Sequence, residues 1–116
     1  MKNFKITEFD SPDLKGSGSF MDDGFLLMLD KARDFANVPF KINSGYRTKE
    51  HNSKISGSPT SSHLLGFAAD ISCTTSAQRV AIVSALIFIG FNRIGIASTF
   101  IHVDNDPNKP IAIWLY

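Results

Sequence analysis

One stretch, SSHLLGFAADIS at residues 61–72, constrains the fold of this chain more than any other. From Gly66 onward it is continuously small and apolar, which is typical of a buried strand. Asp70 lies inside that strand, and a buried carboxylate needs hydrogen bonds, a cation or a metal ion to offset its lost hydration. His63 stands seven residues ahead of it. The two are either satisfied core residues or half of a metal site, and taken alone a histidine in such a stretch favours the first reading.

A second polar pair occurs in FIHVD, residues 100–104. Because alternate side chains of a strand share one face, His102 and Asp104 should point the same way. Two histidines and one carboxylate, with a fourth position left for water, are the ligands of a catalytic zinc site. The single cysteine, Cys73, excludes disulfides and cysteine-rich zinc sites, and we expect it to be a small buried residue.

Helical and strand patterns are mixed along the chain without regular βαβ spacing. Apolar residues recur at helical spacing over residues 22–36, and a largely apolar core helix is predicted over residues 76–89, capped at Thr75 or Ser76. A loop or one short helix follows Arg47. Predicted strands lie at residues 4–9, 39–46, 66–72, 92–97, 99–104 and 111–116. These patterns indicate an α+β protein, in which a small, mostly antiparallel sheet packs with two to three helices in one domain over residues 1–116.

The charge balance excludes some classes of partner. Twelve Lys and Arg stand against eleven Asp and Glu, a net charge of +1. This balance gives no electrostatic footprint for nucleic acid or an anionic membrane, so neither is expected as a partner. The N-terminus lacks the apolar region of a secretory signal, and no apolar run approaches the roughly 20 residues of a membrane helix. We expect a soluble protein made in the cytoplasm, with its oligomeric state left open.

The segment SGYR, residues 44–47, ends one of the predicted strands. Gly45 permits a sharp turn there, so Arg47 should project from the strand end. A guanidinium group in that position can bind a carboxylate through two hydrogen bonds. From spacing alone, the favoured reading is a surface arginine paired with Glu50 or with an aspartate.

Taken together, SGYRTKEHN, SSHLLGFAADI and FIHVD resemble the signatures of the zinc D-Ala-D-Ala carboxypeptidases and related murein peptidases, in the same order and with similar spacing. The resemblance covers the chain from about Met21 to its end. It implies the hedgehog/DD-peptidase fold, with zinc in a cleft. It implies peptides of peptidoglycan as substrates. Within the family the chain most resembles the small single-domain peptidases of bacteria and bacteriophages, so a phage lysis protein is one expectation.

The resemblance also implies roles for individual residues. His63, Asp70 and His102 would bind Zn²⁺. Arg47 would hold a carboxylate or carbonyl of the substrate, and Ser61 would bind substrate near the metal. The implied activity is hydrolysis by a D,D-carboxypeptidase or a murein endopeptidase.

One position departs from the family pattern. Many members carry an acidic general base three residues before the last histidine, where this chain has Thr99. Asp104 is the nearest carboxylate, and it is either the catalytic base or a group that orients His102, with the second role slightly favoured. Asp106 and His51 are further candidates for the base. The simpler interpretation is that Asp106 is a turn residue and His51 a solvated loop histidine.

The missing acid keeps a second function open. The chain is either a zinc peptidase or a zinc-containing module that binds wall peptides or a protein partner without efficient hydrolysis. Trp114 and Tyr116, in the last predicted strand, are expected to pack in the core or to line the rim of the cleft.

Overall fold

A computed structural model describes all 116 residues, and its centre is a five-stranded sheet. The strand order is β1-β2-β4-β3-β5, and every neighbouring pair is antiparallel except β3 and β5, which run parallel at one edge. The strands are β1 (Ile42–Ser44), β2 (Ala68–Ser72), β3 (Arg93–Ile96), β4 (Phe100–Asp104) and β5 (Ala112–Leu115). The α+β class and the mostly antiparallel sheet are therefore confirmed.

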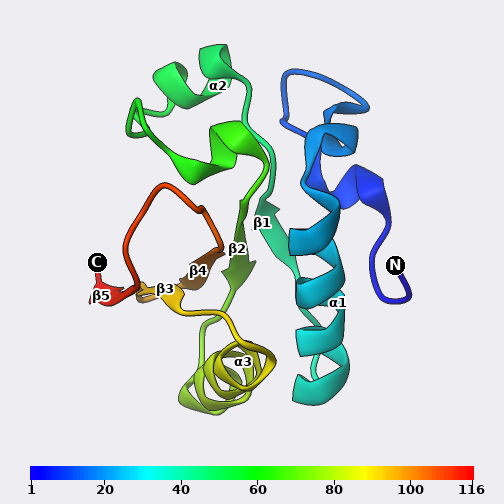
Figure 1. The fold of residues 1–116 in the computed structure, drawn as a ribbon, viewed down its shortest axis with the longest axis vertical. Helices are drawn as coiled ribbons and strands as arrows, with labels where there is room; N and C mark the ends of the chain where they lie inside the picture. Colours follow the sequence, from blue (N-terminus) through cyan, green and yellow to red (C-terminus); the bar gives the residue numbers. More distant parts are fainter.

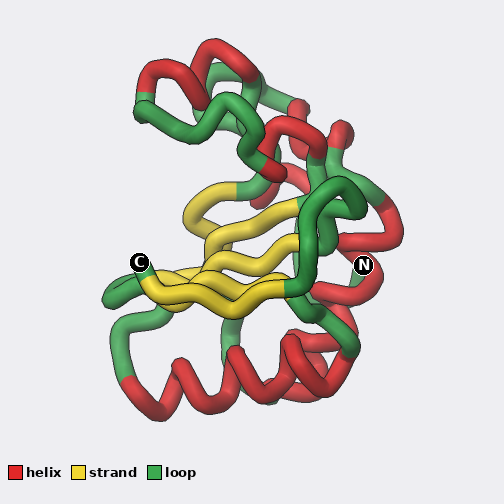
Figure 2. Tube along the Cα trace, turned by 60° about the vertical axis from the view of Figure 1, so that its left-hand side comes forward, coloured by secondary structure: helices red, strands yellow, loops and turns green.

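Two long helices, α1 (Asp23–Ala36) and α3 (Ser76–Ile89), pack on one side of the sheet, as Figures 1 and 2 show. Both begin at side-chain caps, since Asp22 accepts a hydrogen bond from the Phe25 amide and Thr75 forms a capping box with Gln78. None of the helices is long and apolar enough to cross a membrane.

Four short helices lie in the upper half of Figure 1, the first two beside the upper part of α1 and the last two above β1 and β2. These helices are η1 (Ile6–Phe9), η2 (Ser17–Phe20), α2 (Lys49–Lys54) and η3 (Ser62–Leu65). Residues of η3 and of the loop before it border the face of the sheet that α1 and α3 leave uncovered.

Strand alternation separates the core from the opposite face of the sheet. On β2 and β4, Ile71, Ile101 and Val103 are fully buried in the apolar cluster shared with α1 and α3. Their neighbours in sequence, Asp70 on β2 and His102 on β4, belong to the other face. Phe100, His102 and Asp104 line one cavity there, as the alternation predicted. The polar site is consequently built on the side of the sheet that the long helices do not cover.

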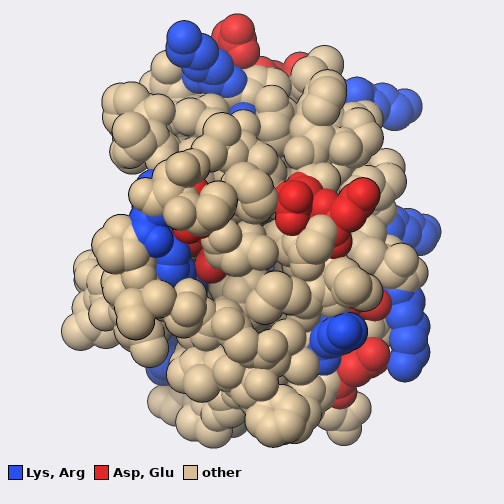
Figure 3. Space-filling model, in the orientation of Figure 1, with Lys and Arg blue, Asp and Glu red and all other residues tan.

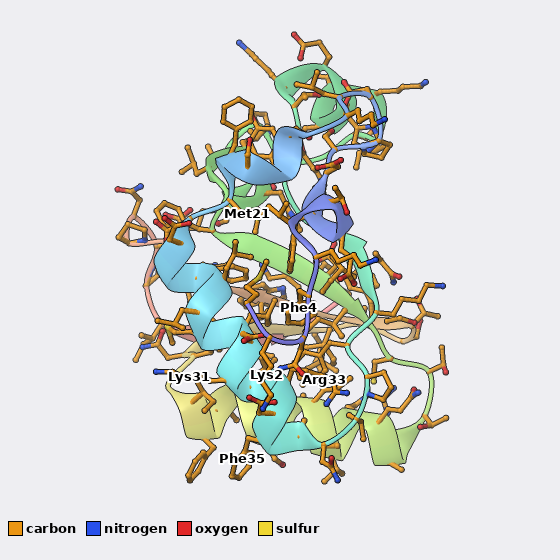
Figure 4. All side chains as sticks on the ribbon, turned by 90° about the vertical axis from the view of Figure 1, so that its right-hand side faces the viewer. Lys2, Phe4, Met21, Lys31, Arg33 and Phe35 are labelled. Carbon is orange, nitrogen blue, oxygen red and sulfur yellow. The ribbon has the colours of Figure 1, made fainter.

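The predicted strand at residues 4–9 is wrong. Ile6–Phe9 form a 3₁₀ helix, in which the Glu8 carboxylate accepts a hydrogen bond from the Lys5 amide. Of the apolar residues that suggested alternation, Phe4 and Phe9 are buried and Ile6 is exposed. The two phenylalanine rings meet edge to face, with 5.5 Å between their centroids. Figure 4 shows Phe4 pointing inward beside α1.

The prediction that α3 is a core helix is correct for only one of its faces. Ile82, Ala85 and Leu86 are buried, but Val80 and Phe88 are each 68% exposed. No further layer of the chain covers this outer face. Phe88 stacks on Phe35 of α1 with 4.1 Å between ring centroids, and Phe35 projects from the lower end of α1 in Figure 4.

The N-terminal segment is attached to α1 through one buried carboxylate. Asp30 accepts hydrogen bonds from the backbone amides of Lys2 and Asn3, both at 2.9 Å. Burial raises the pKa of Asp30, but these hydrogen bonds outweigh burial and leave the pKa below its ordinary value. The stabilising contribution is therefore complete above the pKa of the unfolded chain, about 3.9, and is lost as the pH falls through the lower pKa of the folded state.

We expect Asp30→Asn to lower the free energy of unfolding by about 1–3 kcal/mol at pH 7, because hydrogen bonds to a charged acceptor are lost. The loss should be smaller at pH 3, which is below the pKa of the unfolded chain, because part of the stabilisation by the ionised carboxylate is already lost there. Urea unfolding at the two pH values measures both quantities. Asp23→Asn, an exposed aspartate of the same helix, is the control, and an equal loss for Asp30→Asn at the two pH values would contradict the assignment.

Candidate metal centre

Asp70 and His102 face each other across two paired strands. Asp70 on β2 is the direct cross-strand partner of His102 on β4. Side chains paired in this way lie within contact distance on one face of a sheet. The His102 Nδ1 atom is 2.9 Å from Asp70 Oδ1, and both residues are buried. The sheet register therefore places two of the three predicted metal ligands on a rigid support.

His63 reaches the same place from η3. Ser61 caps this short helix by accepting a hydrogen bond from the His63 amide, and Gly66 ends it in the left-handed region, at φ +77°. The chain then enters β2, so the helical turn and the glycine together account for the spacing between His63 and Asp70. The His63 Nε2 atom is 3.3 Å from Asp70 Oδ1.

The remaining polar atoms of the two histidines have partners that fix their orientation. His63 Nδ1 lies 2.7 Å from the Gly45 carbonyl oxygen, and His102 Nε2 lies 2.7 Å from Asp104 Oδ2. When each of these nitrogens donates its proton, the lone pairs of His63 Nε2 and His102 Nδ1 face Asp70. In zinc sites the histidine ligands usually donate their other ring N–H to a carbonyl or carboxylate group in this way, which fixes the tautomer and the orientation of the ring.

The three side chains fit a metal ion. One ligand atom from each of His63, Asp70 and His102 lies within 4.8 Å of the other two, and all three residues are buried. Two imidazole nitrogens and one carboxylate oxygen match the donors of zinc sites that keep an open coordination position. In the metal-free protein burial raises the pKa of Asp70, but hydrogen bonds donated by the His102 and His63 nitrogens that face it outweigh burial and hold the pKa far below its ordinary value. A bound ion would take the place of those protons. Asp70 is therefore the anionic ligand of this set.

Both oxygen atoms of Asp104 are already engaged. Oδ2 contacts His102, while Oδ1 accepts hydrogen bonds from Arg93 Nε at 2.7 Å and from the Asp106 amide at 3.1 Å. Burial raises the pKa of Asp104, but the hydrogen bonds from His102 and Arg93 outweigh burial and leave the pKa below its ordinary value. Asp104 meets His102 at the nitrogen that points away from Asp70. This geometry favours the orienting role, and the role of catalytic base stays a prediction.

Arg93 was not anticipated from the sequence. Besides Asp104, its guanidinium contacts the Pro110 carbonyl and lies 5.0 Å from the centre of the Trp114 ring. The available signal was an arginine in the otherwise apolar strand RIGI. That signal becomes informative only when β3 is known to pair with β4, because this pairing brings Arg93 beside Asp104.

Arg47 lies inside the site rather than on the surface. Its guanidinium contacts Asp70 Oδ2 at 3.3 Å, Asn52 Oδ1 at 3.3 Å and Ser44 Oγ at 3.1 Å. The reading of a surface arginine paired with Glu50 is therefore wrong, whereas pairing with an aspartate is correct. Substrate binding by Arg47 stays a prediction.

A cavity of about 350 Å³ opens above the three ligands. Arg47 and Ser61 line it, and so do three neighbouring aromatic residues, Phe100, Trp114 and Tyr116. Trp114 and Tyr116 therefore lie at the cleft, one of the two places expected for them. The remaining candidates lie elsewhere: Thr99 is exposed, Cys73 is fully buried, and His51 and Asp106 do not line this cavity. Asp106 instead accepts hydrogen bonds from Ser62 Oγ and the Asn108 amide.

We expect Gly66→Ala to destabilise the protein more than Gly16→Ala does. Both glycines have positive φ, which costs an alanine about 1–2 kcal/mol, but only at Gly66 would the added methyl group overlap a neighbour, the Phe20 carbonyl oxygen. The excess should be at least about 1 kcal/mol, as in an overpacked core. Urea unfolding measures the difference, and equal losses would show that the close packing below His63 has no energetic role.

Comparison with known proteins agrees with this geometry. No curated protein matches the sequence. A family model described as Peptidase M15 matches residues 2–104, which include all three candidate ligands. Because the match covers most of the chain, this protein belongs to the Peptidase M15 family, whose members are zinc-dependent metallopeptidases.

Proposed function

We propose that this protein is a zinc peptidase that hydrolyses peptide bonds in the stem or cross-link peptides of peptidoglycan, as a D,D-carboxypeptidase or a murein endopeptidase. The observation that carries the proposal is the convergence of His63, Asp70 and His102 at the base of an open cavity. Family membership supports a hydrolase of the metallopeptidase class. The proposed place of action is the bacterial cell wall, in the manner of a phage lysis enzyme.

His63, Asp70 and His102 would hold the zinc ion. Bound there, zinc would activate a water molecule near neutral pH and polarise the scissile carbonyl group. Asp70 contributes the single negative charge among the ligands. Asp104 and the Gly45 carbonyl hold the imidazole rings in the required orientation.

The other residues of the cavity are suited to binding a peptide. The Ser61 oxygen accepts a hydrogen bond from the His63 amide, so its hydroxyl proton is available to a substrate carbonyl. Arg47 uses three of its five N–H donors within the protein and retains two for a carboxylate or carbonyl group.

One observation favours a second candidate, a zinc-containing module that binds wall peptides without efficient hydrolysis. The carboxylates that line the cavity are Asp70 and Asp104, and both are engaged, one with the histidines and Arg47, the other with Arg93 and His102. Thr99 supplies no acid in their place. The two candidate functions therefore differ in one requirement: a peptidase needs a group that accepts a proton from the attacking water at neutral pH, and a binding module does not.

We expect the purified protein to bind about one zinc ion per chain and to cleave purified peptidoglycan or defined stem peptides. His63→Ala should lose both properties, whereas His51→Ala, a histidine outside the cavity, should keep them. Elemental analysis measures the metal, and mass spectrometry identifies the bond that is cut. Unchanged zinc content in His63→Ala would overturn the ligand assignment, and retained peptide binding without cleavage at any pH would favour the binding module.

Asp104→Asn separates the two roles considered for Asp104. If the carboxylate orients His102, zinc affinity should fall about 10- to 100-fold, and saturating zinc should restore part of the turnover. If it is the catalytic base, zinc affinity should stay near that of the wild type while turnover is lost at every zinc concentration. We expect the first result, measured by competition with a chelator and by peptide cleavage, and unchanged affinity together with full activity would exclude both roles.

A further inference from the structure

Three basic side chains line the metal cavity, and they differ in exposure. The side chains of Arg47 and Arg93 are 13% and 12% exposed, and each pairs with a carboxylate of the site. The Lys109 side chain is 28% exposed, and its nearest carboxylate, that of Asp106, is 3.8 Å away. Lys109 is therefore the cation of the cavity that solvent, and hence a ligand, reaches most easily.

The ammonium group of Lys109 is held in place by neutral oxygens. Its Nζ atom donates to the Thr60 carbonyl at 2.7 Å and to Ser62 Oγ at 2.9 Å. An ammonium group has three N–H donors, so one remains after these two bonds. Asp106 is nearly buried and already accepts hydrogen bonds from Ser62 and Asn108, so it compensates the lysine charge only in part. The result is a fixed positive group with one free donor.

Lys109 stands between two hollows of the surface. Together with Ser61, it lines both the metal cavity and a neighbouring hollow of about 480 Å³, whose other lining residues include Pro59, Leu64 and Leu65. A peptide that extended from the metal cavity into the second hollow would contact this boundary, because Ser61 and Lys109 line both. Figure 3 shows basic and acidic side chains side by side on this flank of the molecule, beside the loop between β4 and β5.

We propose that Lys109 binds a free carboxylate of the substrate, at a subsite between the metal cavity and the second hollow. The proposal rests on the proposed function and specifies its substrate class: peptides that carry a carboxylate away from the scissile bond, in addition to any group bound by Arg47. A lysine ammonium acts as a compact point charge, which suits one carboxylate approached from a single direction. The Thr60 and Ser62 contacts reduce the cost of ordering the side chain before binding.

Two synthetic peptides test this subsite. One is L-Ala-γ-D-Glu-L-Lys-D-Ala-D-Ala, and the other is the same peptide with the free α-carboxylate of its D-Glu converted to a carboxamide. The readouts are kcat/KM by mass spectrometry and Kd by quenching of Trp114, the single tryptophan, which lines the cavity. We expect the wild type to prefer the carboxylate peptide by about tenfold or more, the value of one charge-assisted hydrogen bond.

Substitutions at Lys109 then show which side chain carries the preference. Lys109→Met should abolish the preference, because the affinity for the carboxylate peptide should fall about tenfold while the affinity for the carboxamide peptide changes little. Lys109→Arg should keep most of the preference. Lys31→Met, an exposed lysine of α1, is the control. An equal loss for both peptides in Lys109→Met would show a purely structural lysine and overturn the proposal.

The wild-type result separates this inference from the function on which it rests. If the wild type cleaves or binds both peptides equally well, the Lys109 subsite is overturned and the peptidase or binding function stands. If it neither cleaves nor binds either peptide, the proposed function is overturned, and the subsite with it.

Discussion

The site depends on a carboxylate that the fold places where an unpaired charge would be very costly. Asp70 lies in the middle of β2, between two other strands. Three groups from three different segments compensate its charge: His102 from β4, His63 from η3 and Arg47 from the loop after β1. Since a buried charge without partners destabilises a protein by several kcal/mol, these segments are held in mutual position by the same atoms that form the metal centre.

The parts of the site that the sequence revealed are those encoded by local periodicity. Alternation along FIHVD placed His102 and Asp104 on one face, and the small residues of β2 marked Asp70 as buried. The start of α3 was predictable because its cap, Thr75, is a local signal. In each case the chemical signal lies within a few residues of the position that it determines.

The parts that the sequence did not reveal depend on the arrangement of distant segments. Arg93 becomes a partner of Asp104 only through the pairing of β3 with β4. Arg47 was read as a surface residue because the nearest acid in sequence is Glu50, whereas its partner in space is Asp70. The outer face of α3 was predicted to be buried from its composition, yet composition carries no information on whether another layer of the chain covers it.

The supports of the three candidate ligands differ in kind, and this difference affects more than catalysis. Asp70 and His102 belong to paired strands, whereas His63 belongs to a single 3₁₀ turn between two loops. An ion shared by His63 and His102 would close a long loop of the chain, and so would act as a reversible cross-link that restricts the unfolded state. Folding and metal binding are then one coupled equilibrium, so the population of folded molecules rises by mass action with the concentration of free metal. The abundance of the enzyme in a cell would thus follow the supply of its own cofactor.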